Sequence, residues 1–467
     1  MEFLTKAVQT VNAYLSDYVL IVLLLGIGIF YSVKTRFVQV RCFGEGMKQL
    51  FGGFGNKGGS GGMSSFQALA TAIAAQVGTG NIVGACGAIL TGGPGAIFWM
   101  WLIAFFGMAT IYAEAVLAQK TRVTGENGEI TGGPVYYITT AFKGKFGKFL
   151  AGFFALFAVL ALGLMGAMIQ SNSIGSTLNT AFGIPNWVGG IITAVLAGFV
   201  FIGGVKRLAS VTEKIVPIMA ALFLIGTFAV IIIRIKDLPE AIMLIFKYAF
   251  KPNAIIGGGI GAALKIAISQ GAKRGLFSNE AGMGSTPHAH ALANVNRPHE
   301  QGIVAMIGVF IDTFIVLTMN ALVVITVLYT GNGPLANGAA GVEGIDKANM
   351  SQIAFSAVFG DKVGGIFIAV CLFFFAFSTI ISWNLFGKIN FNYLFGKKAV
   401  IVYSILAIVF TFLGTVLEND FVWDLQDMFN QLIVIPNVLA LFALSKTVIA
   451  ELKDAQSSKK KNAESAK

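Results

Sequence analysis

Apolar residues dominate this chain in repeated stretches, and short polar segments separate one stretch from the next. Each stretch holds about 20 residues, the length an α-helix needs to cross the hydrocarbon core of a membrane. The pattern predicts an all-α polytopic membrane protein with eleven transmembrane helices, at residues 17–34, 66–90, 96–119, 149–177, 187–204, 212–234, 254–282, 302–329, 363–386, 399–417 and 427–448. A short helix outside the membrane is expected near 351–358, and the charged tail from Lys453 to Lys467 is expected to be disordered.

Two of the predicted spans contain polar, glycine-rich interruptions, at residues 77–81 and 269–282. An unsatisfied backbone group costs several kcal/mol in lipid, so such a break is tolerated only where it lines a cavity inside the protein. Matched interruptions in two halves of a membrane protein point to the binding site of a transporter. The alternative is that the glycines only let helices pack closely. We favour two broken helices, because both stretches carry polar residues; the second break centres on either Gly271 or Gly275.

The ten spans after the first one form two sets of five, and each set opens with a broken helix. An odd number of spans makes the second set enter from the opposite membrane face, which predicts an inverted repeat. The chain is therefore divided into an N-terminal region with the extra span and a basic loop, a first repeat, a second repeat and a cytoplasmic tail, at residues 1–65, 66–236, 237–450 and 451–467.

Charge and composition narrow the class further. Charged residues make up 12% of the chain, and its net charge is +11. The basic residues collect in alternate loops, such as 36–62 and 120–148. The positive-inside rule therefore places the N-terminus outside and the C-terminus in the cytoplasm, and explains the charge better than nucleic-acid binding does.

No catalytic arrangement stands out in the sequence. The three cysteines, Cys42, Cys86 and Cys371, are far apart and suit neither a disulfide framework nor a metal site. No nucleophile–base pair and no nucleotide-binding motif is evident, so catalysis and ATP-driven pumping are disfavoured. No obligate protein partner is indicated. The remaining partners are the lipid bilayer and a transported solute.

The first break can hold a zwitterion's carboxylate and a sodium ion together. Free N–H groups at the start of its second half carry a partial positive charge and attract a carboxylate. Free carbonyls at the end of its first half, residues 74–77, can ligate a hard cation. Asn81 adds an amide oxygen, or else caps the helix.

The second break would complete the site. Carbonyls near Gly271 and in the segment 277–279 can accept an ammonium group, and the Phe277 ring can close one wall. Lys273, Arg274 and Glu280 are expected to form ion pairs at the cytoplasmic mouth rather than touch the solute, because buried charges usually pair.

Other polar residues within spans allow two interpretations each. Gln170 either binds a carboxylate or joins two helices. Ser378, Thr379 and Ser382 either coordinate Na⁺ or donate to their own helix backbone. Glu114 and Asp312 either couple transport to an ion or pair internally; we favour a structural role for Glu114 and leave Asp312 open.

Three motifs together resemble the alanine/glycine:cation symporter family: residues 76–84, 132–134 and 274–285. The resemblance extends over residues 15–450. It implies the leucine-transporter-like architecture of two inverted five-helix repeats, here after one extra N-terminal span. It also implies that the protein is not an enzyme but a secondary active transporter, which takes up alanine or glycine with Na⁺ by alternating access across the cytoplasmic membrane of a prokaryote.

The resemblance further implies roles for individual residues. The backbone amides of Thr79 and Gly80, with Gln170, would hold the carboxylate of the amino acid. Gly271, Phe277 and Ser278 would surround its amine and side chain. Sodium would bind to the carbonyls of Ala74 and Val77 and to Ser378 and Thr379, and Asn81 would be the natural ligand of a second sodium. The alternatives are a proton-coupled amino-acid symporter, in which Asp312 gains importance, and an ion channel.

Overall fold

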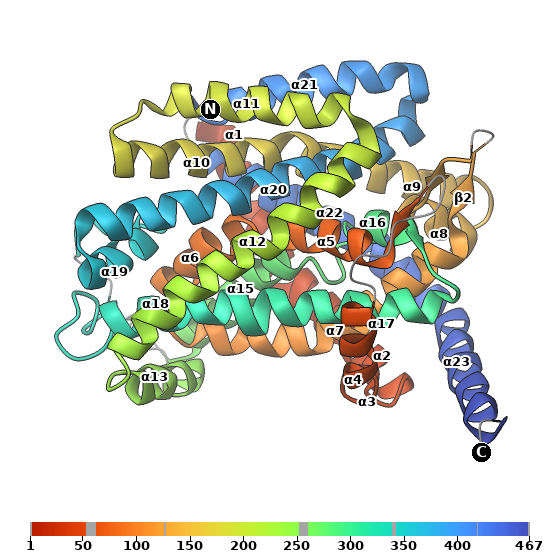
Figure 1. Ribbon diagram of the computed structural model, residues 1–467, viewed down its shortest axis with the longest axis horizontal. Helices are drawn as coiled ribbons and strands as arrows, with labels where there is room; N and C mark the ends of the chain where they lie inside the picture. The colour runs from red at the N-terminus through yellow and green to blue at the C-terminus, as the bar shows by residue number, and fades with distance from the viewer. Residues whose placement is uncertain are drawn as a thin grey trace.

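The computed structural model describes residues 2–52, 62–125, 128–251, 260–338, 342–417 and 419–465. Its described part is nearly all helical (Figure 1). The N-terminal region contains α1 (Glu2–Tyr14), η1 (Leu15–Leu20), α2 (Ile21–Lys34), α3 (Val38–Arg41) and α4 (Phe43–Gly52). The following segment contains α5 (Ser65–Gln76), η2 (Gly80–Gly84), α6 (Ala85–Gly92), α7 (Ala96–Thr121), α8 (Pro134–Ala141), α9 (Gly144–Ala158), η3 (Val159–Met165), α10 (Gly166–Phe182), α11 (Asn186–Ile202), α12 (Gly204–Ile233) and α13 (Leu238–Phe250).

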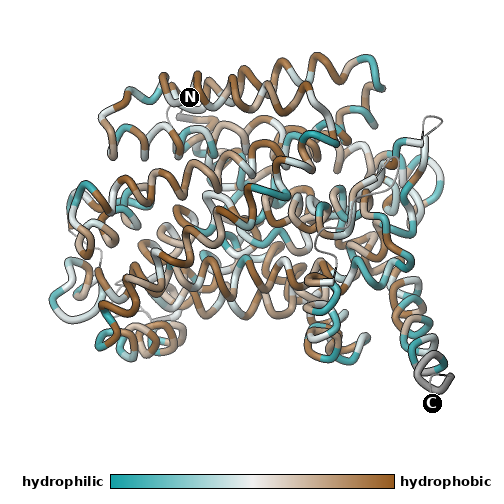
Figure 2. The backbone as a smooth tube through the Cα atoms, in the orientation of Figure 1, coloured by the Kyte–Doolittle hydropathy of each residue, from teal (hydrophilic) through white to brown (hydrophobic). Residues whose placement is uncertain are grey.

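The second half of the chain is built in the same way. It contains α15 (Ile260–Asn279), α16 (Pro287–Ala291), α17 (Pro298–Val309), η4 (Phe310–Leu317), α18 (Thr318–Leu328), α19 (Met350–Phe359), α20 (Asp361–Phe395), η5 (Lys397–Ala399), α21 (Val400–Leu413), α22 (Asn419–Ala443) and α23 (Ser445–Ser465). Figure 2 shows the long helices as mostly hydrophobic, with hydrophilic residues concentrated in the connections and in α23.

Seven helical segments of the described chain are long and apolar enough to cross a membrane, and the bent pair α5 and α6 adds an eighth. The seven are Phe3–Lys34, Ala96–Thr121, Gly144–Phe182, Gly204–Ile233, Pro298–Leu328, Asp361–Phe395 and Asp420–Ala443. The prediction of a helical multi-pass membrane protein is therefore confirmed. Each of the eleven predicted spans overlaps a helix, and residues 254–259 of the seventh lie outside the described residues. The full number of spans and the inverted repeat remain predictions.

The described chain contains two short strand pairs, and one of them ties distant segments together. Strand β1 (Met63–Ser64) pairs in parallel with β4 (Ala293–Asn294), with Met63 opposite Ala293. Because β1 leads directly into α5 and β4 follows α16, this pair joins the entrance of the first broken helix to the exit of the second. Strands β2 (Val123–Thr124) and β3 (Ile130–Thr131) pair antiparallel.

The first broken helix begins at a capping box. The Ser64 hydroxyl accepts from the Gln67 backbone N–H at 3.1 Å, and the Gln67 side chain accepts from the Ser64 N–H at 3.0 Å. Two of the four orphan N–H groups at this end are thus satisfied. Helix α5 then packs against α12, α17 and α20, which places its C-terminal end in the middle of the bundle.

The charged tail is not disordered, contrary to the prediction. Residues 445–465 form α23, which ends at the lower right of Figure 1. Val448, Leu452 and Ala455 are buried, and Glu451 pairs with Lys120 of α7 at 2.8 Å. Apolar residues at this spacing form one stripe along a helix, and that stripe docks α23 onto the rest of the protein.

Candidate functional site

The first predicted break is present. Helix α5 ends at Gln76, η2 begins at Gly80, and the axis bends by 45° between α5 and the η2–α6 segment. Gly78 is required there, because a Cβ atom on it would lie 2.3 Å from Thr379 Oγ1 and 3.3 Å from Gln170 Oε1. The chain therefore loses its helical hydrogen bonds at a point where α10 and α20 approach the backbone closely.

Gln170 of α10 faces this break and not a lipid surface. Its Oε1 atom accepts from the Thr79 backbone N–H at 3.2 Å, and the side chain is 1% exposed. The Gly78 N–H donates to Asn81 Oδ1 at 3.0 Å. The Thr79 hydroxyl is buried and has no hydrogen-bond partner in the described structure. An unpaired buried hydroxyl costs free energy, which a polar ligand beside it would recover.

The end of α5 meets the two hydroxyls that the sequence associated with sodium. Thr379 Oγ1 donates to the Ala74 carbonyl at 2.9 Å, and Ser378 Oγ lies 3.4 Å from the same oxygen. Both hydroxyls also contact the Phe375 carbonyl of their own helix, at 3.0 and 2.9 Å. The hydroxyls thus bond back to α20, as one of the two interpretations expected, and they also gather at the carbonyl end of α5. Their coordination of Na⁺ stays a prediction. The Ser382 hydroxyl is buried and unpaired.

The second break lies at the C-terminal end of the predicted interval 269–282, and it is not centred on Gly271 or Gly275. Helix α15 runs unbroken through Gly271 and Gly275 and ends at Asn279. A Cβ atom on Gly271 would lie 2.5 Å from Trp99 Cβ and 2.9 Å from the Ala96 carbonyl. Gly271 thus lets α7 pack closely against α15, as small residues do in membrane helix pairs, whereas a Cβ atom on Gly275 would lie at an ordinary contact distance of 3.7 Å from Met100 Cα. Gly271 therefore lies on a packing face and not in a break.

The chain actually unwinds after Asn279. Glu280, Gly282 and Gly284 all have positive φ angles, of 58°, 89° and 83°. Such angles are unfavourable for most residues and easy for glycine. The Gly282 N–H donates to Glu114 Oε2 at 3.1 Å, and Asn437 Nδ2 donates to Glu114 Oε1 at 2.6 Å. Glu114 thus holds the unwound segment, in agreement with the structural role favoured for it.

Glu280 is likewise occupied by the protein. One of its oxygens accepts from the indole N–H of Trp383 at 2.5 Å, and the other accepts from the Ser285 hydroxyl. It does not pair with Lys273 or Arg274. Those two cations both contact Asp427, at 2.6 and 3.2 Å, so the predicted ion pairs exist but use a partner on α22.

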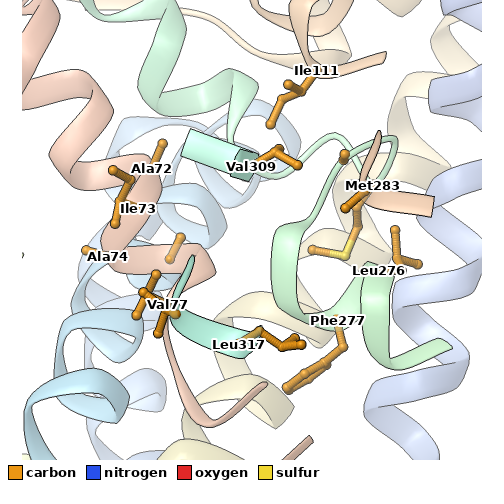
Figure 3. Close-up of a cluster of buried hydrophobic side chains, with 14 of the residues drawn as sticks. Ala72, Ile73, Ala74, Val77, Ile111, Leu276, Phe277, Met283, Val309 and Leu317 are labelled. Atoms are coloured by element: carbon orange, nitrogen blue, oxygen red, sulfur yellow. The ribbon is translucent and has the colours of Figure 1, made fainter. Parts of the chain in front are cut away.

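The last turn of α15 brings Phe277 and Ser278 to the first break. A Cβ atom on Gly80 would lie 3.1 Å from both the Phe277 ring and the Ser278 Cα. Figure 3 shows Phe277 with Val77 and Leu317 in one buried apolar cluster. The Phe277 ring centroid lies 5.9 Å from that of Trp383 and 5.2 Å from that of Trp423. These two tryptophans were not singled out from the sequence, because an isolated tryptophan in an apolar run has no distinguishing signal.

A buried carboxylate completes the group. Asp312 of η4 accepts from Asn81 Nδ2 at 2.6 Å, from Thr313 Oγ1 at 2.8 Å and from Ser278 Oγ at 3.0 Å. Asn320 Nδ2 donates to the Asn81 carbonyl at 3.1 Å. Asn81 therefore has partners in the 298–328 segment, which the sequence could not identify. The structure places Gly271 on a different face and gathers the other ten predicted site residues around the first break. These are Ala74, Val77, Thr79, Gly80, Asn81, Gln170, Phe277, Ser278, Ser378 and Thr379.

Comparison with known proteins identifies the family. The model of the sodium:alanine symporter family matches residues 1–467. The chain belongs to this family. It is therefore a multi-pass membrane transporter and not an enzyme, as the resemblance of its motifs implied.

Relatives and solved structures agree with this assignment. The sodium/alanine symporter AgcS of Methanococcus maripaludis is 38% identical over 467 residues, covering 100% of both chains. The probable sodium/glutamine symporter GlnT of Bacillus subtilis is 37% identical, covering 98% of this chain and 92% of its own. The structure of MhsT in complex with L-phenylalanine matches with a TM-score of 0.58 at 15% identity, over 85% of this chain and 96% of that one. At that identity the likeness shows the fold alone.

Proposed function

We propose that this symporter takes up a small neutral amino acid, alanine or glycine, together with Na⁺ across the cytoplasmic membrane of a prokaryote. The N-terminus lies outside and the C-terminus inside, as the distribution of basic residues indicates. The observation that carries the proposal is the meeting of two helix ends of opposite polarity. The N–H groups at residues 79–80 begin η2, and the carbonyl end of α15 lies against Gly80.

The amino-acid carboxylate binds at the first break. Thr79 and Gly80 supply backbone N–H groups at the positive end of the η2–α6 segment, where anions are stabilised. The Thr79 N–H is now held by Gln170 Oε1. When a carboxylate takes that N–H, the Gln170 amide is free to donate its own NH₂ to the ligand, and the unpaired Thr79 hydroxyl gains an acceptor.

The ammonium group faces the end of α15. The last carbonyls of a helix have no intrahelical partner and carry a partial negative charge. The Phe277 carbonyl would lie 3.4 Å from a Cβ atom on Gly80, so it is close to the carboxylate position. Phe277 and Ser278 thus keep their proposed role around the amine, and the role first given to Gly271 passes to these last carbonyls.

The small side chain of the solute meets a wall of rings. Phe277 is 3% exposed and Trp383 is fully buried. A Cβ atom on Gly166 would lie 2.4 Å from the Trp383 ring, so α10 already presses against that indole. This crowding of buried rings supports a solute with a small side chain, alanine or glycine, over larger amino acids.

Two oxygen-rich clusters flank the carboxylate position and suit sodium. One consists of the Ala74 and Val77 carbonyls with the hydroxyls of Ser378 and Thr379, which already converge on the Ala74 oxygen. The other consists of Asn81 and Asp312 with the hydroxyls of Ser278 and Thr313. Carbonyl and hydroxyl oxygens at unwound helix ends are the usual sodium ligands in such transporters.

The pair of Lys273 and Arg274 with Asp427 marks one entrance. On the proposed orientation α15 enters from outside, so these charges lie on the external half of the protein and not at the cytoplasmic mouth where we first expected them. The Arg274 guanidinium also lies 5.0 Å from the centre of the Trp423 ring, which itself contacts Phe277. The entrance and the ring wall are therefore in direct contact.

Uptake by purified protein in liposomes tests the proposal. Radiolabelled alanine should accumulate when an inward Na⁺ gradient is applied and should stop accumulating when the gradient is collapsed. Uptake that ignores Na⁺ and is abolished by a protonophore would contradict sodium coupling and favour proton coupling through Asp312. Single-channel currents that need no amino acid would contradict symport altogether, since a channel needs a continuous polar pore.

A further inference from the structure

Three potential metal ligands meet at the start of α17, and none of them belongs to the group of residues around the first break. Cys42 Sγ, a carboxylate oxygen of Glu45 and a ring nitrogen of His299 all lie within 4.8 Å of one another. Cys42 and His299 are 7% and 3% exposed, and the Glu45 side chain is 28% exposed. Thiolate, imidazole and carboxylate are the ligand types that zinc prefers. One face of the cluster is thus open to solvent through Glu45.

Close backbone packing builds this cluster. Cys42 and Glu45 stand three residues apart around the start of α4, so their side chains lie on one face. A Cβ atom on Gly46 would lie 2.7 Å from the Ile303 carbonyl of α17, so only glycine lets the two helices approach this closely. The Phe43 and Phe310 rings pack edge to face beside it, 4.8 Å apart. Helix α4 therefore presents both of its ligand atoms to His299 on a rigid base.

His299 is oriented in the way that metal-binding histidines are. Its Nδ1 atom hydrogen-bonds to the Tyr112 hydroxyl at 2.9 Å, and its Nε2 atom lies 3.5 Å from Glu45 Oε1. In metal sites the ring nitrogen that does not touch the ion is almost always held by such a hydrogen bond, which fixes the ring and its tautomer. Tyr112 of α7 thus leaves Nε2 directed into the cluster.

A cation of the protein already sits on the cluster. The Lys459 ammonium of α23 contacts Glu45 Oε1, and the Lys459 side chain is 54% exposed. An exposed ion pair of this kind contributes little to stability. A divalent ion competing for the same carboxylate therefore displaces the lysine at small cost.

We propose that Cys42, Glu45 and His299 form a binding site for a divalent transition metal of the zinc class, in competition with Lys459. On binding, the Cys42 thiol gives its proton to solvent and coordinates as the thiolate, His299 coordinates through Nε2 and Glu45 through one oxygen. Water fills the fourth position, the arrangement typical of three-ligand zinc sites. Since Lys459 is released, the metal also weakens the docking of α23.

Cobalt titration of the purified, full-length protein in detergent tests the site. A thiolate bound to Co²⁺ gives a near-ultraviolet charge-transfer band that oxygen and nitrogen ligands do not give. We expect a saturable band, bleached by added Zn²⁺, that is lost in Cys42→Ser and retained in Cys371→Ala, a control at another buried cysteine. His299→Gln and Glu45→Gln should weaken Co²⁺ binding by about 10- to 100-fold or more.

Two further variants separate the metal site from a merely structural cluster. Lys459→Ala should raise the affinity for Co²⁺, whereas Lys453→Ala, on the exposed side of the same helix, should leave it unchanged. Tyr112→Phe should weaken binding by about tenfold and leave the position of the band unchanged, because Tyr112 only orients the ligand.

The proposal is overturned if no charge-transfer band develops, or if the band is as strong in Cys42→Ser as in the unchanged protein. Should Cys42→Ser fail to give a monodisperse protein, His299→Gln decides the question, since unaltered Co²⁺ affinity in that variant overturns the proposal equally. These readouts need no transport activity, so their failure is distinct from failure of the proposed symport.

Discussion

The two unwound segments of this protein differ in what satisfies their backbone. At 77–79 the structure leaves the Thr79 hydroxyl unpaired, and a single glutamine side chain caps the Thr79 N–H. At 280–286 Glu114 accepts from the Gly282 N–H, Glu280 accepts from the Ser285 hydroxyl and the Trp383 indole, and the Thr286 hydroxyl is buried without a partner in the described structure. Each segment thus leaves one hydroxyl unpaired, but the Thr79 N–H of the first is held by one neutral amide, whereas the Gly282 N–H of the second is held by a carboxylate. The difference teaches that unwound backbone alone does not make the proposed binding site: its N–H groups must be held weakly enough for a ligand to replace their partner.

The largest effect is expected for Thr79→Pro. Proline removes the N–H that we assign to the substrate carboxylate but suits the backbone of this residue, whose φ angle is −59°. A hydrogen bond to a charged group contributes about 1.5–3 kcal/mol, so alanine affinity should fall roughly 10- to 100-fold or more. Calorimetric titration with alanine in saturating Na⁺ measures this loss of affinity.

Thr79→Ala is the matched control for that substitution, because it removes the hydroxyl and keeps the N–H. Its loss of affinity should be smaller than that of the proline variant. Full affinity in a folded Thr79→Pro protein would remove the residue from the site and make the two unwound segments equivalent.

Two glycine substitutions test the same comparison between the two segments, with a smaller expected effect. In Gly78→Ala the new methyl group meets Thr379 Oγ1, and in Gly271→Ala it meets Trp99 and Ala96. Overpacking costs about 1–3 kcal/mol in either place. At Gly78 the cost should appear as weaker binding of Na⁺ and alanine, and at Gly271 as a lower melting temperature with normal affinity. Equal losses of alanine affinity in both variants would restore Gly271 to the site.

The smallest effect on binding is expected for Glu114→Gln. A glutamine keeps the size of the side chain but leaves one of the two donors, the Gly282 N–H or the Asn437 amide, without an acceptor. The protein should lose about 1 kcal/mol of stability or more, and alanine affinity should stay the same. Thermal unfolding monitored by size-exclusion chromatography gives the first quantity and calorimetry the second. A large loss of affinity with unchanged stability would mean that the second segment also binds the solute.

The two unwound segments also differ in how well the sequence predicted them. The first break was predictable, because Thr79 and Asn81 have no reason to lie in an apolar run unless the helix opens there. The centre of the second break was placed too early in the chain, because a glycine that breaks a helix and a glycine that packs against a neighbouring helix look alike in a sequence. Only the positions of Trp99 and Ala96, on a different helix, show which use Gly271 has.

Contacts between residues far apart in the chain explain the other features that could not be predicted from the sequence. Asp312 was left open because its partners Asn81 and Ser278 lie in other segments. The cysteines were rejected as metal ligands because they are far apart in the chain, yet folding brings His299 and Glu45 to Cys42. The tail was taken as disordered from its charge, although it continues the helix 445–465, which Val448, Leu452 and Ala455 dock on the bundle.

Phe277 touches Gly80, Trp383 and Trp423, so one ring reports on three helical elements at the same time. A bound amino acid whose side chain displaces the Phe277 ring would also separate α20 from α22 beside that ring. We therefore expect bulky amino acids that reach the site to inhibit transport instead of being transported, because they would prevent the transporter from closing over them. The transporter would then distinguish substrates from inhibitors by whether the transport cycle can be completed, and not by the affinity of initial binding.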